Sequence, residues 1–490
     1  MFFLEALYAK EGRARARLRS RDFRVGISVA LAPGSGLQSR ARPAGELNTM
    51  MSRPGLVVVA LVLFATVAAR AAEGPKPGET LDQSTWREAE TLLPPEILRH
   101  YREGEYSNPI VDWPESKYSW PPDFLAATKA NAGRFTVGPR GEILSKETGK
   151  QPPYVLGLPF PTIDPSDPAA GVKVVWNQFY RFWYFGNLLA ESQVNWISPR
   201  GLDRRTDLDV RFAYYDGVPA DERLPNPQNF LTQALILVKA PADLHGTAAL
   251  TWRYRDPDRR DSTWSYVPAL RRVRAVSPAN RSDGFLGSDM SQDDGPFFDG
   301  KPEDFEWHLK GEAEGLRFAE DLNLKDVSKA RWVPEVGAWD ADWPDTKFLG
   351  YMDPAWKGLA WAPTGPSVLA RRPFWVVEGV PRDRYYLYGK LELWIDKLTY
   401  QGAWHRKYGW KGEQLNTMQV MAWNPIPFTR PNGKVDYMQG SNMAYQCAEN
   451  LKLNRATVAG IKSSPTSHFY GRIKFNPDVF DVEALVRSGK

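Results

Sequence analysis

Residues 387–395 read LYGKLELWI, and this stretch decides the fold class. Its large apolar side chains are separated by even intervals, at Leu387, Leu391, Leu393 and Ile395. Alternation with a period of two is typical of a β-strand that buries one face and exposes the other.

The same alternation recurs on both sides of this stretch, at residues 208–214, 250–254 and 418–422. Turn-forming clusters punctuate the chain at residues 256–258, 381–383 and 431–433. Successive alternating strands with short turns predict an antiparallel meander from about residue 172 onward. Such a sheet must cover its apolar face, so it could curl into a barrel or half-barrel, pack on a second sheet, or accept helices.

A different pattern precedes the strands. Residues 84–103 show helical spacing interrupted by Pro94 and Pro95, and Glu96–Arg102 is expected to form a second short helix. Residues 104–170 are rich in Pro, Gly, Asp and Ser, with single aromatic residues between them. The mature chain is therefore divided into a helical and loop-rich N-terminal arm, 72–170, and an antiparallel β domain, 171–490.

The leader is a separate feature. Residues 56–69, LVVVALVLFATVAA, follow Arg53 and precede the small-residue site Ala69-Arg70-Ala71. This pattern predicts a secretory signal peptide over 50–71, with 1–49 as a misassigned upstream extension. The alternative is that the arginine-rich stretch near the start acts as a transit peptide. We expect a soluble mature protein in the periplasm.

Composition excludes some function classes. The formal net charge is +5, but much of the positive charge lies in the leader region, and the remainder is nearly neutral. Nucleic-acid binding is therefore not expected. The chain has 19 tryptophans and a single cysteine, Cys447, which excludes an intramolecular disulfide and a cysteine metal site. The tryptophans suit either a large aromatic core or an aromatic-lined cavity.

Two groups of residues are candidates for ligand contact. The first would line a cavity from the strand faces, although core packing explains the same pattern: Trp252, Tyr254, Trp264, Tyr266, Leu391, Leu393 and Met418. The second would recognise an anionic head group or a partner, although solvated charges explain it equally: Arg271, Arg272 and Arg274. Strand geometry predicts that Arg272 and Arg274 share a face.

Metal, cofactor and catalytic signatures are weak. Residues 289–295 resemble a calcium loop, but Asp294 stands where glycine is required and Gly300 where a bidentate glutamate is required. A loop held by aspartate hydrogen bonds is the preferred interpretation. The five histidines form no metal-binding motif, and phosphate loops, nucleophile elbows and dinucleotide fingerprints are absent from the sequence. We predict no cofactor, no metal and no catalytic residue.

Three stretches carry a resemblance to a known family: residues 157–183, 263–294 and 374–404. The second, TWSYVPALRRVRAVSPANRSDGFLGSDMSQDD, is the most specific of the three. Together they resemble domain of unknown function 1329, a family of exported bacterial proteins related to the lipoprotein-sorting carriers. The resemblance implies a half-barrel with helices on its open side and an acyl chain or similar lipid as ligand. The chain is about twice as long as those carriers, so lipoprotein sorting itself does not follow.

The sequence thus predicts a periplasmic carrier for a lipid or other hydrophobic molecule. By resemblance it would serve an envelope transport system, with an inner-membrane exporter or outer-membrane protein as partner. Two alternatives stay open: a secreted hydrolase with an aromatic-lined cleft, and an accessory protein of a transport complex that binds no ligand. The oligomeric state is not readable from the sequence.

Overall fold

The computed structural model describes residues 74–113, 120–321, 329–342, 347–422, 426–429, 435–438, 443–462 and 467–488. The predicted upstream extension 1–49, the predicted signal peptide 50–71 and the predicted turn at 431–433 lie outside these residues. Within the described part of the chain, every helix is too short or too polar to cross a membrane.

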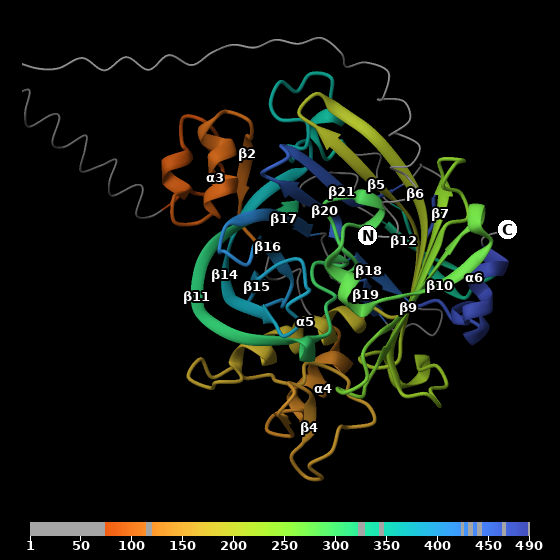
Figure 1. The fold of residues 1–490 in the computed structure, drawn as a ribbon. Coiled ribbons are helices and arrows are strands. Elements are labelled where there is room, and N and C mark those ends of the chain that lie inside the picture. The colour runs from red at the N-terminus through yellow and green to blue at the C-terminus, as the bar shows by residue number, and fades with distance from the viewer. Residues whose placement is uncertain are drawn as a thin grey trace, which may run out of the picture. The chain divides into compact units, whose positions relative to one another are not determined.

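One large sheet dominates the described residues and joins 18 strands (Figure 1). From one edge to the other, antiparallel neighbours follow as β10, β9, β8, β7, β6, β5, β21, β20, β17, β16, β15, β14 and β11. Their bounds are Arg272–Val276, Ser262–Val267, Ala248–Tyr254, Phe230–Ala240, Gly201–Tyr214, Leu188–Ser198, Arg455–Lys462, Met443–Asn450, Gln414–Ala422, Gly402–Tyr408, Lys390–Asp396, Ser367–Pro381 and Phe305–Glu320. This arrangement confirms the predicted antiparallel sheet.

Shorter strands extend the sheet at its margins. β2 pairs in parallel with β14, and β1 pairs with β2, while β22 joins β5 to β13 and β13 joins β12. Two separate hairpins are β3–β4 and β18–β19. Their bounds are Thr80–Leu81 (β1), Asn108–Val111 (β2), Phe135–Val137 (β3), Ile143–Ser145 (β4), Lys329–Val333 (β12), Ala338–Asp342 (β13), Ile426–Thr429 (β18), Val435–Met438 (β19) and Phe469–Gly471 (β22).

Within the described residues, four α-helices accompany these strands: α3 (Pro95–Arg102), α4 (Pro122–Ala130), α5 (Ala170–Trp183) and α6 (Val482–Ser488). Helix α3 confirms the short helix expected at 96–102, and only a 3-10 turn, Trp86–Ala89, forms before it. The prediction that strands begin near 172 is wrong, because residues 170–183 form α5. Apolar residues at Val172, Val175, Trp176 and Phe179 have helical spacing, so the signal was present in the sequence.

The sheet is curled around helix α5. Side chains from β6 and β7, and from β11, β14, β15 and β17, belong to one buried cluster with α5. Strands that lie far apart in the sheet can share one cluster only if the sheet bends towards it, so the α5 side is the inner face (Figure 1). Residues 277–304, here called the crossing segment, run from β10 at one edge to β11 at the other.

The opposite face is covered in two places. Helix α3 and residues 347–362 pack over β11, β14, β16, β17, β20 and β21. Helix α6 and the residues before it cover β7, β8 and β9. Apolar residues therefore occur on both faces of the sheet, and strand alternation alone could not tell the inner face from the outer one.

Candidate ligand site between helix α5 and the sheet

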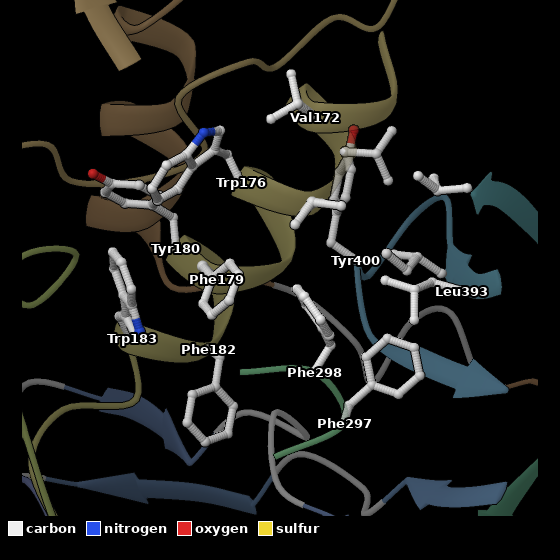
Figure 2. Close-up of a cluster of buried hydrophobic side chains, with 14 of the residues drawn as sticks. Val172, Trp176, Phe179, Tyr180, Phe182, Trp183, Phe297, Phe298, Leu393 and Tyr400 are labelled. Atoms are coloured by element: carbon white, nitrogen blue, oxygen red, sulfur yellow. The ribbon is translucent and has the colours of Figure 1, made fainter. Parts of the chain in front are cut away.

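Helix α5 presents a continuous aromatic surface to the inner face. Trp176, Phe179 and Trp183 are each at most 2% exposed, and Phe182 points towards the sheet (Figure 2). Phe298 of the crossing segment packs edge-on against Phe179, with ring centroids 6.1 Å apart. The helix lies very close to β11 at Gly171, where a Cβ atom would be 2.9 Å from the carbonyl carbon of His308. Helix α5 thus packs directly against β11 at its first turn.

A small cavity remains between α5, the sheet and the crossing segment. Its volume is about 20 Å³, enough for roughly one water molecule and far too small for an acyl chain. Six aromatic side chains contribute to its wall. The lining residues are Gln178, Phe179, Phe182, Trp183, Phe212, Tyr214, Thr232, Ala234, Thr251, Arg253, Pro296, Phe298 and Asp299.

Two polar groups at this cavity lack hydrogen-bond partners. The Gln178 Oε1 atom and the Tyr214 hydroxyl are buried and unbonded, although both residues are only 3% exposed. A buried polar atom without a partner costs about 1–3 kcal/mol. Because both residues line the cavity, a ligand or water held there could supply the missing bonds.

An ionic network closes one side of the cavity. Arg253 donates to both carboxylate oxygens of Asp261, at 2.8 and 3.0 Å to Oδ2 and 3.3 Å to Oδ1, and to Asp299 at 3.1 Å. Arg281 of the crossing segment donates to Asp293 at 2.6 Å and lies 3.2 Å from Asp261. The network ties the crossing segment to β8 and β9.

Burial raises the pKa values of three acidic groups in this region, Asp299, Glu303 and Asp304. Burial raises the pKa of Asp299 to about 6, against the lowering effect of Arg253 and Arg281. Burial likewise raises the pKa of Glu303 to about 7, although Lys301 lowers it, and neither Glu303 oxygen has a hydrogen-bond partner. The region thus carries carboxyl groups that are poorly compensated by positive charge.

A second set of contacts anchors the crossing segment further along the inner face. Lys407 of β16 forms a buried ion pair with Asp294, and His405 lies 3.6 Å from the same carboxyl group. Asp289 accepts hydrogen bonds from Arg455 and Asn450. The aspartates of residues 289–295 therefore make hydrogen bonds and ion pairs within the protein, as the sequence predicted for this loop. A search of the described residues finds no group of His, Cys, Asp and Glu that could hold a metal ion.

The structure divides the predicted cavity residues between two places. Leu391, Leu393 and Met418 are fully buried in the α5 cluster on the inner face. Trp252, Tyr254, Trp264 and Tyr266 belong instead to the cluster under helix α6.

The two tryptophans under α6 contact each other at 4.6 Å between ring centroids, and the Trp252 indole N–H donates to the Phe480 carbonyl oxygen at 2.8 Å. Thr251 and Arg253, which alternate with Trp252 on β8, line the cavity on the inner face. The seven predicted residues do not form one cavity wall, and their role in ligand contact stays a prediction.

The three predicted arginines lie together at one edge of the sheet. Arg272 and Arg274 are exposed on β10, where they share a face as predicted, and Arg271 precedes them in a left-handed turn with φ of 49°. Among the residues that the structure describes, none of the three forms an ion pair. Leu387, expected in a strand, lies in the turn before β15 and is 49% exposed.

Sequence reasoning missed helix α5 and the buried network of the crossing segment. The helical spacing of 172–183 could have revealed the helix. The network carried no such signal, because Arg253 and Asp299 are 46 positions apart and their pairing depends on the fold.

A curled antiparallel sheet with an aromatic helix on its inner face defines the structural class of this protein. A family model described as protein of unknown function (DUF1329) matches residues 80–331, and the chain belongs to this family.

Among solved structures, a DUF1329 family protein from Desulfovibrio piger is 15% identical, with a TM-score of 0.40, covering 65% of this chain and 100% of that one. A LolA superfamily protein from Nitrosomonas europaea is 12% identical, with a TM-score of 0.35, covering 63% of this chain and 96% of that one. No curated protein matches the chain.

Proposed function

We propose that this protein is a periplasmic carrier that holds a hydrophobic or amphiphilic molecule between helix α5 and the inner face of the sheet. The observation that carries the proposal is the cavity at this place, which combines aromatic walls with unbonded polar atoms on Gln178 and Tyr214. Ligand sites in proteins typically pair apolar walls with a few converging polar groups.

The cavity of about 20 Å³ describes a closed state. To admit a ligand, α5 or the crossing segment must move away from the sheet, and the ligand then replaces the aromatic contacts that are lost. Affinity would come from apolar burial, at roughly 25 cal/mol per Å² before the costs of binding are subtracted.

The arrangement of charges favours a carrier over a secreted hydrolase. Asp261 and Asp293 are bound to Arg253 and Arg281. A glycosidase instead presents two carboxyl groups across an open groove, about 5–10 Å apart. Export through the predicted signal peptide and service to an envelope transporter are parts of the same proposal. Arg271, Arg272 and Arg274 are the residues proposed to contact a head group or partner.

The first experiment is native purification from the periplasm, followed by solvent extraction and lipid mass spectrometry. We expect a hydrophobic molecule at close to one per protein. An empty protein that also binds no fluorescent hydrophobic probe would contradict the carrier function and favour the accessory-protein alternative.

Two matched substitutions locate the ligand. Phe179→Ala alters the α5 side of the cavity, whereas Trp264→Ala alters the cluster under α6. We expect Phe179→Ala to lose the co-purified molecule and Trp264→Ala to retain it, with circular dichroism confirming that both variants are folded. If only Trp264→Ala lost the co-purified molecule, the ligand site would lie under α6, where the aromatic candidates predicted from the sequence are found.

A further inference from the structure

The polar side of the cavity, where Arg253 and Asp299 belong to the lining, is surrounded by more carboxyl groups than cations. Its electrostatically coupled groups are three cations and five carboxyls: Arg253, Arg281, Lys301, Asp261, Asp293, Asp299, Glu303 and Asp304. An incoming anion would meet this excess of acidic groups in a region of low dielectric, where unpaired charge is expensive.

The cations in this group are already engaged. Each of the three guanidinium nitrogens of Arg253 contacts Asp261 or Asp299. Arg281 is shared between Asp293 and Asp261, and the ammonium group of Lys301 donates to two backbone carbonyls at 2.7 Å each. An anionic head group would have to compete with these carboxylates for guanidinium groups that they already neutralise.

The groups that do lack partners at the cavity are uncharged. Gln178 offers a carbonyl oxygen as acceptor, and Tyr214 offers a hydroxyl that can donate or accept. Thr232 and Thr251 add further hydroxyl groups to the lining. A ligand hydroxyl group could donate to Gln178 or bond to Tyr214, and a ligand carbonyl could accept from Tyr214.

From these contacts we infer that the ligand is an uncharged hydrophobe bearing a hydroxyl or carbonyl group, and that fatty acids and other anionic lipids are disfavoured. This inference rests on the proposed carrier function and names its ligand class. It applies to the α5 cavity. The exposed arginines of β10 lie outside the cavity lining, and with an uncharged ligand they would contact a partner and not a head group.

The test compares three molecules with one chain length and different polar ends: hexadecanol, hexadecanoic acid and hexadecylamine. Each competes at about pH 8 with N-phenylnaphthylamine, an uncharged fluorescent probe. We expect the alcohol to displace the probe at a concentration at least tenfold lower than the acid. The amine is attracted by the carboxyl groups, but its ammonium group can accept no hydrogen bond from Tyr214, so we expect it to bind no more tightly than the alcohol. Equal or stronger competition by the acid, or stronger competition by the amine, would overturn the inference while leaving a carrier in place. If neither the probe nor any of the three molecules binds, the carrier function fails, and the ligand class fails with it.

Two neighbouring tyrosines supply a matched pair of variants. Tyr214→Phe removes the unbonded hydroxyl at the cavity. Tyr215→Phe removes a hydroxyl that donates to Gln233 of β7, and Tyr215 belongs to the cluster under α6. Loss of one buried hydrogen bond should weaken hexadecanol binding about tenfold in Tyr214→Phe, without changing probe binding. Tyr215→Phe should leave both unchanged, and equal effects of the two substitutions would contradict the assignment of Tyr214.

A third variant tests the role of charge. Asp299→Asn removes one carboxylate beside the cavity while keeping its size. We expect this substitution to reduce the ratio between the concentrations of hexadecanoic acid and hexadecanol that displace the probe. An unchanged preference would mean that the carboxyl groups do not select the ligand.

Discussion

His100 should make the stability of this protein depend on pH in the alkaline range. The side chain lies on α3 and is 1% exposed. Its Nδ1 atom is 2.6 Å from Glu105 Oε2 and its Nε2 atom is 2.7 Å from Glu449 Oε2 on β20. Burial lowers the pKa of His100, but the hydrogen bonds and charges of the two glutamates outweigh it and raise the pKa from 6.5 to about 9.

The direction of the effect follows from proton linkage. The folded protein binds the His100 proton more tightly than the unfolded chain does. The extra stability is therefore fully present below pH 6.5 and is lost as the pH rises through about 9. At 1.36 kcal/mol per pKa unit, the difference between 6.5 and about 9 corresponds to about 3 kcal/mol. Glu105 is one-third exposed and screened by solvent, so a value nearer 2 kcal/mol is expected.

Urea unfolding of the protein and of His100→Gln, at about pH 6 and about pH 9.5, measures this contribution. We expect the stability gap between the two proteins to shrink by about 2–3 kcal/mol at the higher pH. Arg99→Gln is the control, because it removes a neighbouring contact to Glu449 while leaving His100 in place. A gap that stays constant or widens with pH would refute the reasoning.

Three further predictions concern the packing that shapes the inner face and its borders. Asp396 is fully buried between two arginines, so Asp396→Asn should lower the free energy of unfolding by about 3–5 kcal/mol, and a loss below 1 kcal/mol would contradict its role. Burial, helped by the charge of Lys407, lowers the pKa of His405 from 6.5 to about 3. Because the unfolded chain then binds the extra proton, stability should fall as the pH drops below 6.5, by up to about 1.4 kcal/mol per pH unit, and His405→Gln should flatten that slope in urea titrations. Gly171→Ala would force α5 away from β11, costing roughly 1–3 kcal/mol, whereas an unchanged melting temperature would show that the contact is adaptable.

Much of the sheet could be predicted from the sequence because its signals are local. The alternation around Leu391 and Leu393 reflects the pleat of a single strand, and the turn at 381–383 reflects the preferences of a few adjacent residues. The short helix at 96–102 was equally readable from its proline and its spacing. Helix α5 was missed although its spacing was present, because the segment is rich in valine and aromatic residues, which also favour strands.

The arrangement of the faces depended on the tertiary structure. The sequence by itself determined that Trp252 and Trp264 would share one face of their strands. Both faces of this sheet are covered, however, and only the curl of the sheet decided which helix covers which face. Helix α6 covers the two tryptophans, whereas α5 covers Leu391 and Met418. The polar side of the cavity also depends on the tertiary structure, because residues of the crossing segment pair there with residues of other strands that are distant in the sequence. The alternation of apolar and polar residues in a strand shows that the two faces of the strand differ. Which face is buried, and by what, is set by the distant segment that packs against it.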